Sequence, residues 1–214
     1  MPRLTDLSFD LSLPYPFYRP ATGSERALIF VHIPKTGGTS IHKALDLPNP
    51  RRAAGLRKHH PAGEIAAHFP DERWQNAFKF AFVRNPYTRL VSHYFYRKKE
   101  GRILKHYGRE LSFNDWVQRA LGAEQPGNLR PQYEWVADQN GQLMLDYIGK
   151  FEQLSLDFTE VLNKVGLRLK KLPHLNRNAA SINYLDLYDA VSRQLAADFY
   201  HEDFQRFGYS KTLS

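Results

Sequence analysis

The residue types that can bind an anion gather in one short segment, residues 32–40, which reads His-Ile-Pro-Lys-Thr-Gly-Gly-Thr-Ser. Gly37 and Gly38 allow the backbone to approach a ligand closely, and backbone N–H groups at the start of a helix attract negative charge. Lys35 adds a full positive charge. Further hydrogen-bond donors are the hydroxyl groups of Thr36, Thr39 and Ser40. The pattern predicts a loop that cradles a phosphate or sulfate, whereas a lone Gly-Gly pair is more typical of a tight turn.

The order of residues in this loop argues against a standard nucleoside triphosphatase. A Walker loop places its lysine after the second glycine, but Lys35 precedes both glycines. The one candidate for holding magnesium at a strand end is Asp146. Cysteine is absent, and the histidines do not have the spacing of metal ligands. The sequence therefore favours anion transfer that requires no metal.

Two apolar runs predict strands that are buried on both faces of a parallel sheet. The first is residues 27–33 and the second is residues 78–83. After the first, we expect a helix capped by Thr39 or Ser40 that continues to about Leu47. After the second, we expect a helix whose cap and first residue are Asn85 and Pro86.

Weaker local patterns predict the remaining elements. Ser112 and Asp115 have the spacing of a capping box before a third helix. The other expected elements are a strand at residues 143–148, a helix from Leu154 to Val165 closed by Gly166, and a last helix at residues 187–199. Alternating strands and helices indicate an α/β fold with an open, mainly parallel sheet flanked by helices, which binds ligands beyond the carboxyl ends of its strands. We expect a single domain over residues 1–214, with an N-terminal extension at residues 1–26 and a core at 27–210.

The chain is strongly basic, with a formal net charge of +8 and a pI of about 9.6, which favours an anionic partner without identifying it. Two clusters stand out: Arg51, Arg52, Arg57 and Lys58, and then Arg97, Lys98, Lys99, Arg102 and Lys105. The sequence shows neither a signal peptide nor a long apolar segment. We therefore expect a soluble, cytoplasmic protein without a transmembrane anchor.

Two motifs of this sequence resemble those of the membrane-associated carbohydrate sulfotransferase family, which also has bacterial members, and they occur in the same order as in that family. They are residues 32–41 and the pair 82–86 and 89–94. Weaker similarity continues through residues 130–132, 149–152, 157–158, 172–176 and 203–209. The resemblance implies a P-loop-like sulfotransferase fold and 3′-phosphoadenosine 5′-phosphosulfate (PAPS) as donor substrate, with PAP as product. It does not carry over Golgi residence, because the family's membrane anchor and stem have no counterpart here.

The resemblance also implies roles for individual residues. The phosphosulfate loop corresponds to Pro34, Lys35, Thr36, Gly37, Gly38, Thr39 and Ser40, and the 3′-phosphate site to Arg84 and Ser92. Lys35 would act on the leaving group. The stretch at residues 57–62 places the general base at His59, with His60 as the alternative, and Arg177 would lie near a phosphate of the nucleotide.

The resemblance thus implies a PAPS-dependent O-sulfotransferase that uses a histidine base for in-line transfer to a hydroxyl group of a carbohydrate or glycoconjugate. Two alternatives remain: a P-loop-type nucleotide-binding kinase, and a non-catalytic basic module that binds anions. No nucleic-acid-binding motif is present, so nucleic acid is not an expected partner.

Overall fold

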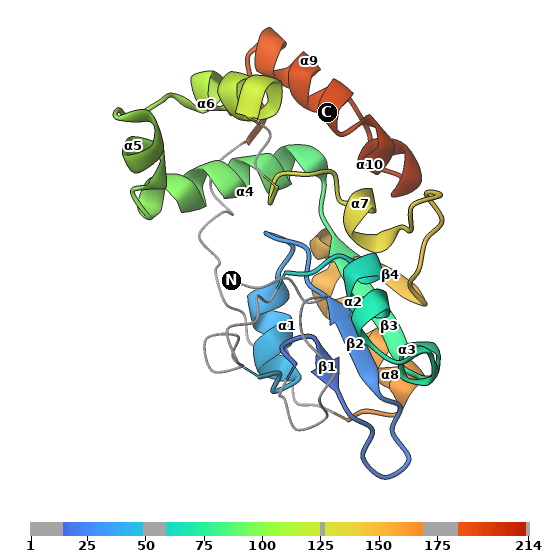
Figure 1. Cartoon of the computed structure of the whole chain (residues 1–214). Coiled ribbons are helices and arrows are strands. Elements are labelled where there is room, and N and C mark those ends of the chain that lie inside the picture. The colour runs from blue at the N-terminus through green and yellow to red at the C-terminus, as the bar shows by residue number, and fades with distance from the viewer. Residues whose placement is uncertain (1–14, 49–58, 125–126, 169–183, 213–214) are drawn as a thin grey trace. The chain divides into compact units, whose positions relative to one another are not determined.

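The computed structural model describes residues 15–48, 59–124, 127–168 and 184–212 (Figure 1). The chain divides into two compact units. The first combines Met1–Val83 with Gln132–Leu175, and the second combines Arg84–Pro131 with Asn176–Ser214. The single domain expected over residues 1–214 stays a prediction. In the described part of the chain, no helix combines the length and the apolar character needed to cross a membrane.

The first unit is built on a four-stranded sheet with the strand order β1-β2-β3-β4. The strands are β1 (Tyr18–Arg19), β2 (Leu28–Val31), β3 (Phe78–Val83) and β4 (Tyr147–Lys150). The β1–β2 pair is antiparallel, whereas the β2–β3 and β3–β4 pairs are parallel. The prediction of an open, mainly parallel sheet is confirmed, and both apolar runs form its fully buried inner strands.

The fourth strand was predicted too early in the sequence. Leu143 forms an isolated bridge with Ala137 instead of joining the sheet. The sheet pairing begins only at Tyr147, which lies opposite Phe80 in β3. The cause is non-local: a short apolar run pairs where a neighbouring strand offers free backbone groups, and hydrophobicity alone does not fix that position.

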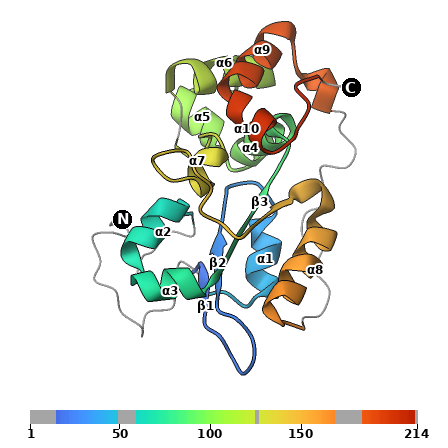
Figure 2. The same cartoon turned by 90° about the vertical axis from the view of Figure 1, so that its right-hand side faces the viewer.

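Helices cover both faces of this sheet (Figure 2). On one face α1 (Gly38–Ala44) and α8 (Leu154–Val165) pack on the alternate side chains Phe30, Phe80 and Phe82. On the other face lie α2 (Ala62–His68) and α3 (Asp71–Asn76). The short helix α7 (Tyr133–Val136) lies against α2, and a 3₁₀ turn, η3 (Phe151–Gln153), precedes α8. Gly166, at φ 75°, ends α8 as predicted.

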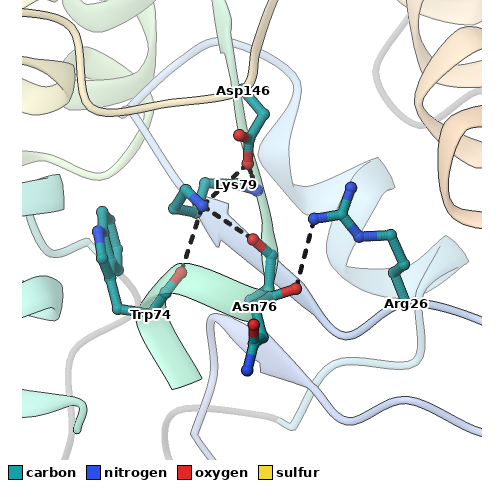
Figure 3. Close-up of polar contacts among 6 residues, drawn as sticks. Arg26, Trp74, Asn76, Lys79 and Asp146 are labelled. Carbon is teal, nitrogen blue, oxygen red and sulfur yellow. Dashed lines mark hydrogen bonds and ion pairs between the residues drawn. The ribbon is translucent and has the colours of Figure 1, made fainter. Parts of the chain in front are cut away.

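A buried lysine closes the amino end of the two central parallel strands (Figure 3). The Nζ atom of Lys79, near the start of β3, lies 3.0 Å from Oδ2 of Asp146 and donates to the carbonyl oxygens of Trp74 and Ala77 at 3.2 and 2.9 Å. The same carboxylate accepts the backbone N–H of Lys79 at 2.7 Å. Asp146, the only acidic residue considered for magnesium, is therefore an ion-pair partner that precedes its strand.

The second unit is helical. Its elements are α4 (Pro86–Lys99), α5 (Arg102–Tyr107), α6 (Phe113–Arg119), the π-helical turn η2 (Ala120–Glu124), the 3₁₀ turn η4 (Tyr184–Leu187), α9 (Ala190–Phe199) and α10 (His201–Arg206). An aromatic core joins them; for example, the hydroxyl of Tyr188 donates to the carbonyl oxygen of Tyr87 at 2.9 Å.

The helix caps of the second unit were largely predictable. Asn85 accepts hydrogen bonds from two backbone N–H groups of α4, and Ser112 accepts the backbone N–H of Asp115, as expected. The helix predicted at residues 187–199 corresponds to α9, which begins at Ala190, and the following helix α10 was not predicted. Asp189 caps α9 by accepting the N–H of Ser192 at 2.7 Å, and this carboxylate cap stops the helix from extending backward.

The Lys79–Asp146 pair gives a stability prediction. Asp146→Ala should lower the free energy of unfolding by about 1–3 kcal/mol, because it leaves a buried ammonium group without its counter-charge. The side chain of Asp146 is 38% exposed, which keeps the loss below that of a fully buried pair. Urea denaturation measures the change. The matched control is Lys164→Met, which removes the exposed Lys164–Glu160 pair and should cost less than about 0.5 kcal/mol. Equal losses in the two variants would contradict the assignment.

Candidate active site

The segment at residues 32–40, called the glycine loop below, leads from the carboxyl end of β2 into the first turn of α1. Lys35 and Gly37 both have positive φ angles, 70° and 86°, so the chain turns sharply twice before the helix. Gly37 is the N-cap residue of α1, and its carbonyl oxygen accepts the N–H of Ser40 at 3.0 Å. The prediction that Thr39 or Ser40 caps this helix is wrong: both residues lie inside its first turn, and no side chain caps it. The helix also ends at Ala44 rather than Leu47.

Packing requires glycine at position 38, whereas at Gly37 the positive φ angle and the packing act together. A Cβ atom at Gly38 would lie 1.9 Å from Nε2 of His32, far inside contact distance. At Gly37 it would lie 2.8 Å from Cδ2 of Leu154 on α8. The loop is therefore held between the end of β2 and the start of α8, and any larger residue would displace it.

The side chains of the glycine loop differ in how far they are buried. Thr36 is fully buried, and its hydroxyl donates to the carbonyl oxygen of Ile33 at 2.9 Å, which stabilises the turn. Pro34 and Ser40 are also buried, whereas Lys35 is half-buried and Thr39 is exposed. Lys35 and Thr39 are thus the side chains of this segment with the most access to solvent.

The predicted base His59 lies beside this loop, in the same unit. Its Nδ1 atom is 2.8 Å from the carbonyl oxygen of His32, and the two imidazole rings have centroids 4.3 Å apart. Trp135 of α7 approaches the ring of His59 edge-on at 6.4 Å. Two residues that are far apart in the sequence, His59 and the first residue of the glycine loop, are therefore brought into direct contact.

The alternative base, His60, has a different environment. It is 3% exposed, and its ring meets that of Phe17 edge-on at 5.7 Å. Its Nδ1 atom lies 3.2 Å from Oε2 of Glu64, although the geometry is not that of a hydrogen bond. The structure thus places His60 in the packed interior and His59 at the loop.

Arg84 follows β3 directly and belongs to the second unit. Its Nε atom donates to Oγ1 of Thr88 at 3.0 Å, and that hydroxyl donates to the carbonyl oxygen of Asn85 at 3.1 Å. Ser92 is half-buried and lies one helical turn beyond Thr88 on α4. Thr88 therefore orients the guanidinium group, a role that the sequence reasoning missed although the four-residue spacing of Thr88 and Ser92 was visible.

Arg89, from the same motif, is structural. It is 1% exposed, lies against the ring of Tyr200 at 5.9 Å, and donates to the carbonyl oxygens of Asn128 and Arg130, both at 3.2 Å. Burial lowers the pKa of its guanidinium group, although the nearby Tyr200 and Asp203 act in the opposite direction. Arg84 and Arg89 thus differ in environment although they belong to the same motif: the first is half-buried and the second is fully buried.

Some predicted residues lie outside the described part of the chain: Arg177 near the nucleotide, and Arg51, Arg52, Arg57 and Lys58 of the first basic cluster. The predicted phosphosulfate loop belongs to the first unit, and Arg84 of the predicted 3′-phosphate site belongs to the second. Among the described residues, no group of three or more His, Asp or Glu side chains forms a candidate metal site.

Comparison with known proteins identifies the class. The model of the sulfotransferase family matches residues 22–210, and the chain belongs to this family. It is 24% identical over 226 residues to human carbohydrate sulfotransferase 9, covering 86% of this chain and 51% of the relative. It is 27% identical over 184 residues to mouse carbohydrate sulfotransferase 12, covering 70% and 44%. The chain spans about half the length of these relatives.

The fold comparison agrees with the family. The crystal structure of mouse sulfotransferase SULT7A1 complexed with PAP superposes with a TM-score of 0.52 at 12% identity, over 83% of this chain and 84% of that one. The predicted sulfotransferase fold is confirmed. An uncharacterized protein from Archaeoglobus fulgidus is 32% identical over 105 residues, which cover 49% of this chain and 80% of that protein.

The packing of the loop gives a second prediction. Gly38→Ala should destabilise the protein by about 1–3 kcal/mol, because the new methyl group overlaps the buried ring of His32. Adding His32→Ala should recover part of that loss, since it removes the obstacle. Urea denaturation of the four proteins of this double-mutant cycle measures the coupling.

The matched control is Gly63→Ala on α2, where the nearest atom to a new Cβ is the sulfur of Met144 at 4.0 Å. Alanine should be neutral or stabilising there, because it favours the helix. If Gly38→Ala behaves like Gly63→Ala, the ring of His32 does not constrain the loop.

Proposed function

We propose that this chain transfers a sulfuryl group from PAPS to a hydroxyl group of a carbohydrate or glycoconjugate. The observation that carries the proposal is the contact between His59 and the glycine loop within one unit, because it combines a candidate base with a candidate phosphosulfate cradle. Membership of the sulfotransferase family supports sulfuryl transfer, and the similarity to a sulfotransferase complexed with PAP supports the choice of nucleotide.

The loop is proposed to bind the phosphosulfate group through its backbone N–H groups and through Lys35, Thr39 and Ser40. Positive charge from Lys35 stabilises the negative charge that develops on the departing phosphate. Thr36 contributes indirectly, since its hydroxyl holds the turn by bonding to Ile33. The loop thus supplies both positioning and electrostatic stabilisation, which are the main sources of rate in transfer of this kind.

The 3′-phosphate is proposed to bind Arg84 and Ser92, with Thr88 orienting the guanidinium group of Arg84. A planar guanidinium group suits a phosphate, because it can donate two parallel hydrogen bonds. Arg177 is proposed as an additional phosphate ligand on the strength of its motif position alone. Two anionic groups on one nucleotide thus meet two separate sets of donors, and no metal ion is needed in this scheme.

His59 is proposed as the general base. A neutral imidazole can accept the proton of the acceptor hydroxyl as its oxygen attacks the sulfur, which strengthens the nucleophile during bond formation. His59 is preferred over His60 because it contacts the loop, whereas His60 is packed against Phe17.

The expected cytoplasmic location stays a prediction.

Nucleotide binding tests the donor site. Calorimetric titration should show that PAP binds and that ATP with magnesium does not, because the loop lacks the Walker arrangement. Arg84→Gln should weaken PAP binding about 10- to 100-fold through loss of charge-assisted hydrogen bonds. Thr88→Val should weaken it less, since it removes only the group that orients Arg84.

The matched control for Thr88→Val is Thr159→Val on α8, where an exposed threonine hydroxyl also bonds to a backbone carbonyl, that of Ser155. This control should leave PAP affinity unchanged. Tighter binding of ATP with magnesium than of PAP would instead support the kinase alternative.

Turnover tests the base. ³⁵S-labelled PAPS and a panel of hydroxyl-bearing glycans first identify an acceptor. His59→Ala should then reduce the transfer rate about 10²- to 10⁴-fold while PAP affinity stays within twofold, because the base acts in the transition state. His201→Ala, an exposed histidine on α10, is the control and should retain activity. Full activity of His59→Ala together with an inactive His60→Ala would move the role to His60.

A further inference from the structure

His32 directly follows the last paired residue of β2, and its backbone carbonyl contacts His59. Pairing between β2 and β3 extends to Val31, opposite Ala81. Immediately afterwards the N–H of Ile33 bonds to the carbonyl oxygen of Val31 at 3.2 Å, which makes a three-residue turn centred on His32. The carbonyl of His32 therefore points out of the strand pairing, and its oxygen lies 2.8 Å from Nδ1 of His59.

This contact fixes where the proton of His59 resides. A carbonyl oxygen only accepts hydrogen bonds, so Nδ1 must be the donor and must carry a hydrogen. A neutral imidazole has a single N–H group, and its other nitrogen then holds a lone pair. With Nδ1 protonated, that other nitrogen is Nε2, and it is the only ring atom able to take up a further proton.

The side chain of His32 is enclosed on several sides, which restricts movement of the backbone that carries the carbonyl. Its ring is 3% exposed, stacks on Phe30 with centroids 5.3 Å apart, and lies 5.1 Å from the ring of His42 on α1. The backbone of Gly38 closes the remaining side, so closely that a Cβ atom there would overlap the ring. A single residue thus links the strand end, the first turn of α1 and the candidate base.

We infer that His32 is a positioning residue whose main-chain carbonyl holds His59 as the Nδ1–H tautomer, so that Nε2 receives the proton during transfer. This inference rests on the proposed function. The acceptor oxygen forms a bond to sulfur, the bond between sulfur and the bridging phosphate oxygen breaks, and its electron pair leaves with PAP. The hydroxyl proton moves to Nε2. The resulting imidazolium keeps its Nδ1–H bond to His32, and the carbonyl dipole stabilises the new charge.

The tautomer can be observed without any substrate. In protein labelled with ¹⁵N at histidine, long-range ¹H–¹⁵N correlation spectra at a pH where the histidines are neutral report which ring nitrogen is protonated. The signals that disappear in His59→Ala identify His59. We expect them to show a protonated Nδ1 and an unprotonated Nε2. A protonated Nε2 in that difference spectrum would overturn the inference, whether or not the protein transfers sulfate.

A pair of substitutions separates the hydrogen bond from the chemistry. In His59→Asn the side-chain amide nitrogen takes the place of Nδ1 and can still donate to the carbonyl of His32, but nothing replaces Nε2. We expect His59→Asn to keep the melting temperature of the parent protein, and His59→Ala to lose about 2–4 °C. Both should lose transfer activity about 10²-fold or more.

Each result has a distinct meaning. Equal melting temperatures for the Asn and Ala variants would overturn the hydrogen bond to His32. Retained activity in His59→Asn would show that Nε2 is not the proton acceptor. Absence of sulfuryl transfer by the parent protein, together with an Nδ1–H signal for His59, would reject the proposed function while leaving the tautomer established.

Discussion

The close packing of the His32 ring against the backbone of Gly38 is the constraint on which the arrangement of the loop depends. The ring occupies the volume where a side chain at position 38 would lie, so α1 can begin there only with glycine. The same ring stacks on Phe30 of β2, which ties the helix to the strand that leads into it. Because interiors are close-packed, such a contact allows little movement. The same residue supplies the backbone carbonyl that lies 2.8 Å from Nδ1 of His59, so His32 connects the packing of the loop to the contact with His59.

The two ends of the parallel strands are used differently. At the amino end of β3, the Lys79–Asp146 pair and two backbone carbonyls satisfy a buried charge, which closes that edge of the sheet. At the carboxyl end, β2 passes into the glycine loop and β3 passes into Arg84 without an intervening residue. Ligand sites of open α/β sheets are expected at this carboxyl edge, where loops are free to vary. The buried ion pair therefore stabilises the sheet at the end opposite to the glycine loop.

Local sequence signals predicted the elements that local interactions determine. The apolar runs of β2 and β3, the cap of α4 by Asn85 and the end of α8 at Gly166 all depend on residues close to one another in the chain. The start of α1 and the position of β4 were predicted wrongly, because side-chain packing from another element fixes the first and strand pairing fixes the second. The contact of His59 with His32 spans 27 residues, and no local pattern encodes it. Only the family resemblance selected His59 from the sequence.

Residues of the same chemical type differ in burial, both in the glycine loop and in the segment that follows β3. The hydroxyl groups of Thr36 and Thr39 were both predicted to donate to the anion. Thr36, however, is fully buried, and its hydroxyl donates to the carbonyl oxygen of Ile33. Arg84 and Arg89 differ in the same way: the first is half-buried and oriented by Thr88, whereas the second is buried and bonds to two backbone carbonyls. A buried polar group needs a hydrogen-bond partner, and for the Thr36 hydroxyl and the Arg89 guanidinium group that partner is a backbone carbonyl. Burial together with these internal hydrogen bonds therefore gives Thr36 and Arg89 structural roles, whereas Thr39 and Arg84 keep the access to solvent that the proposed ligand contacts require.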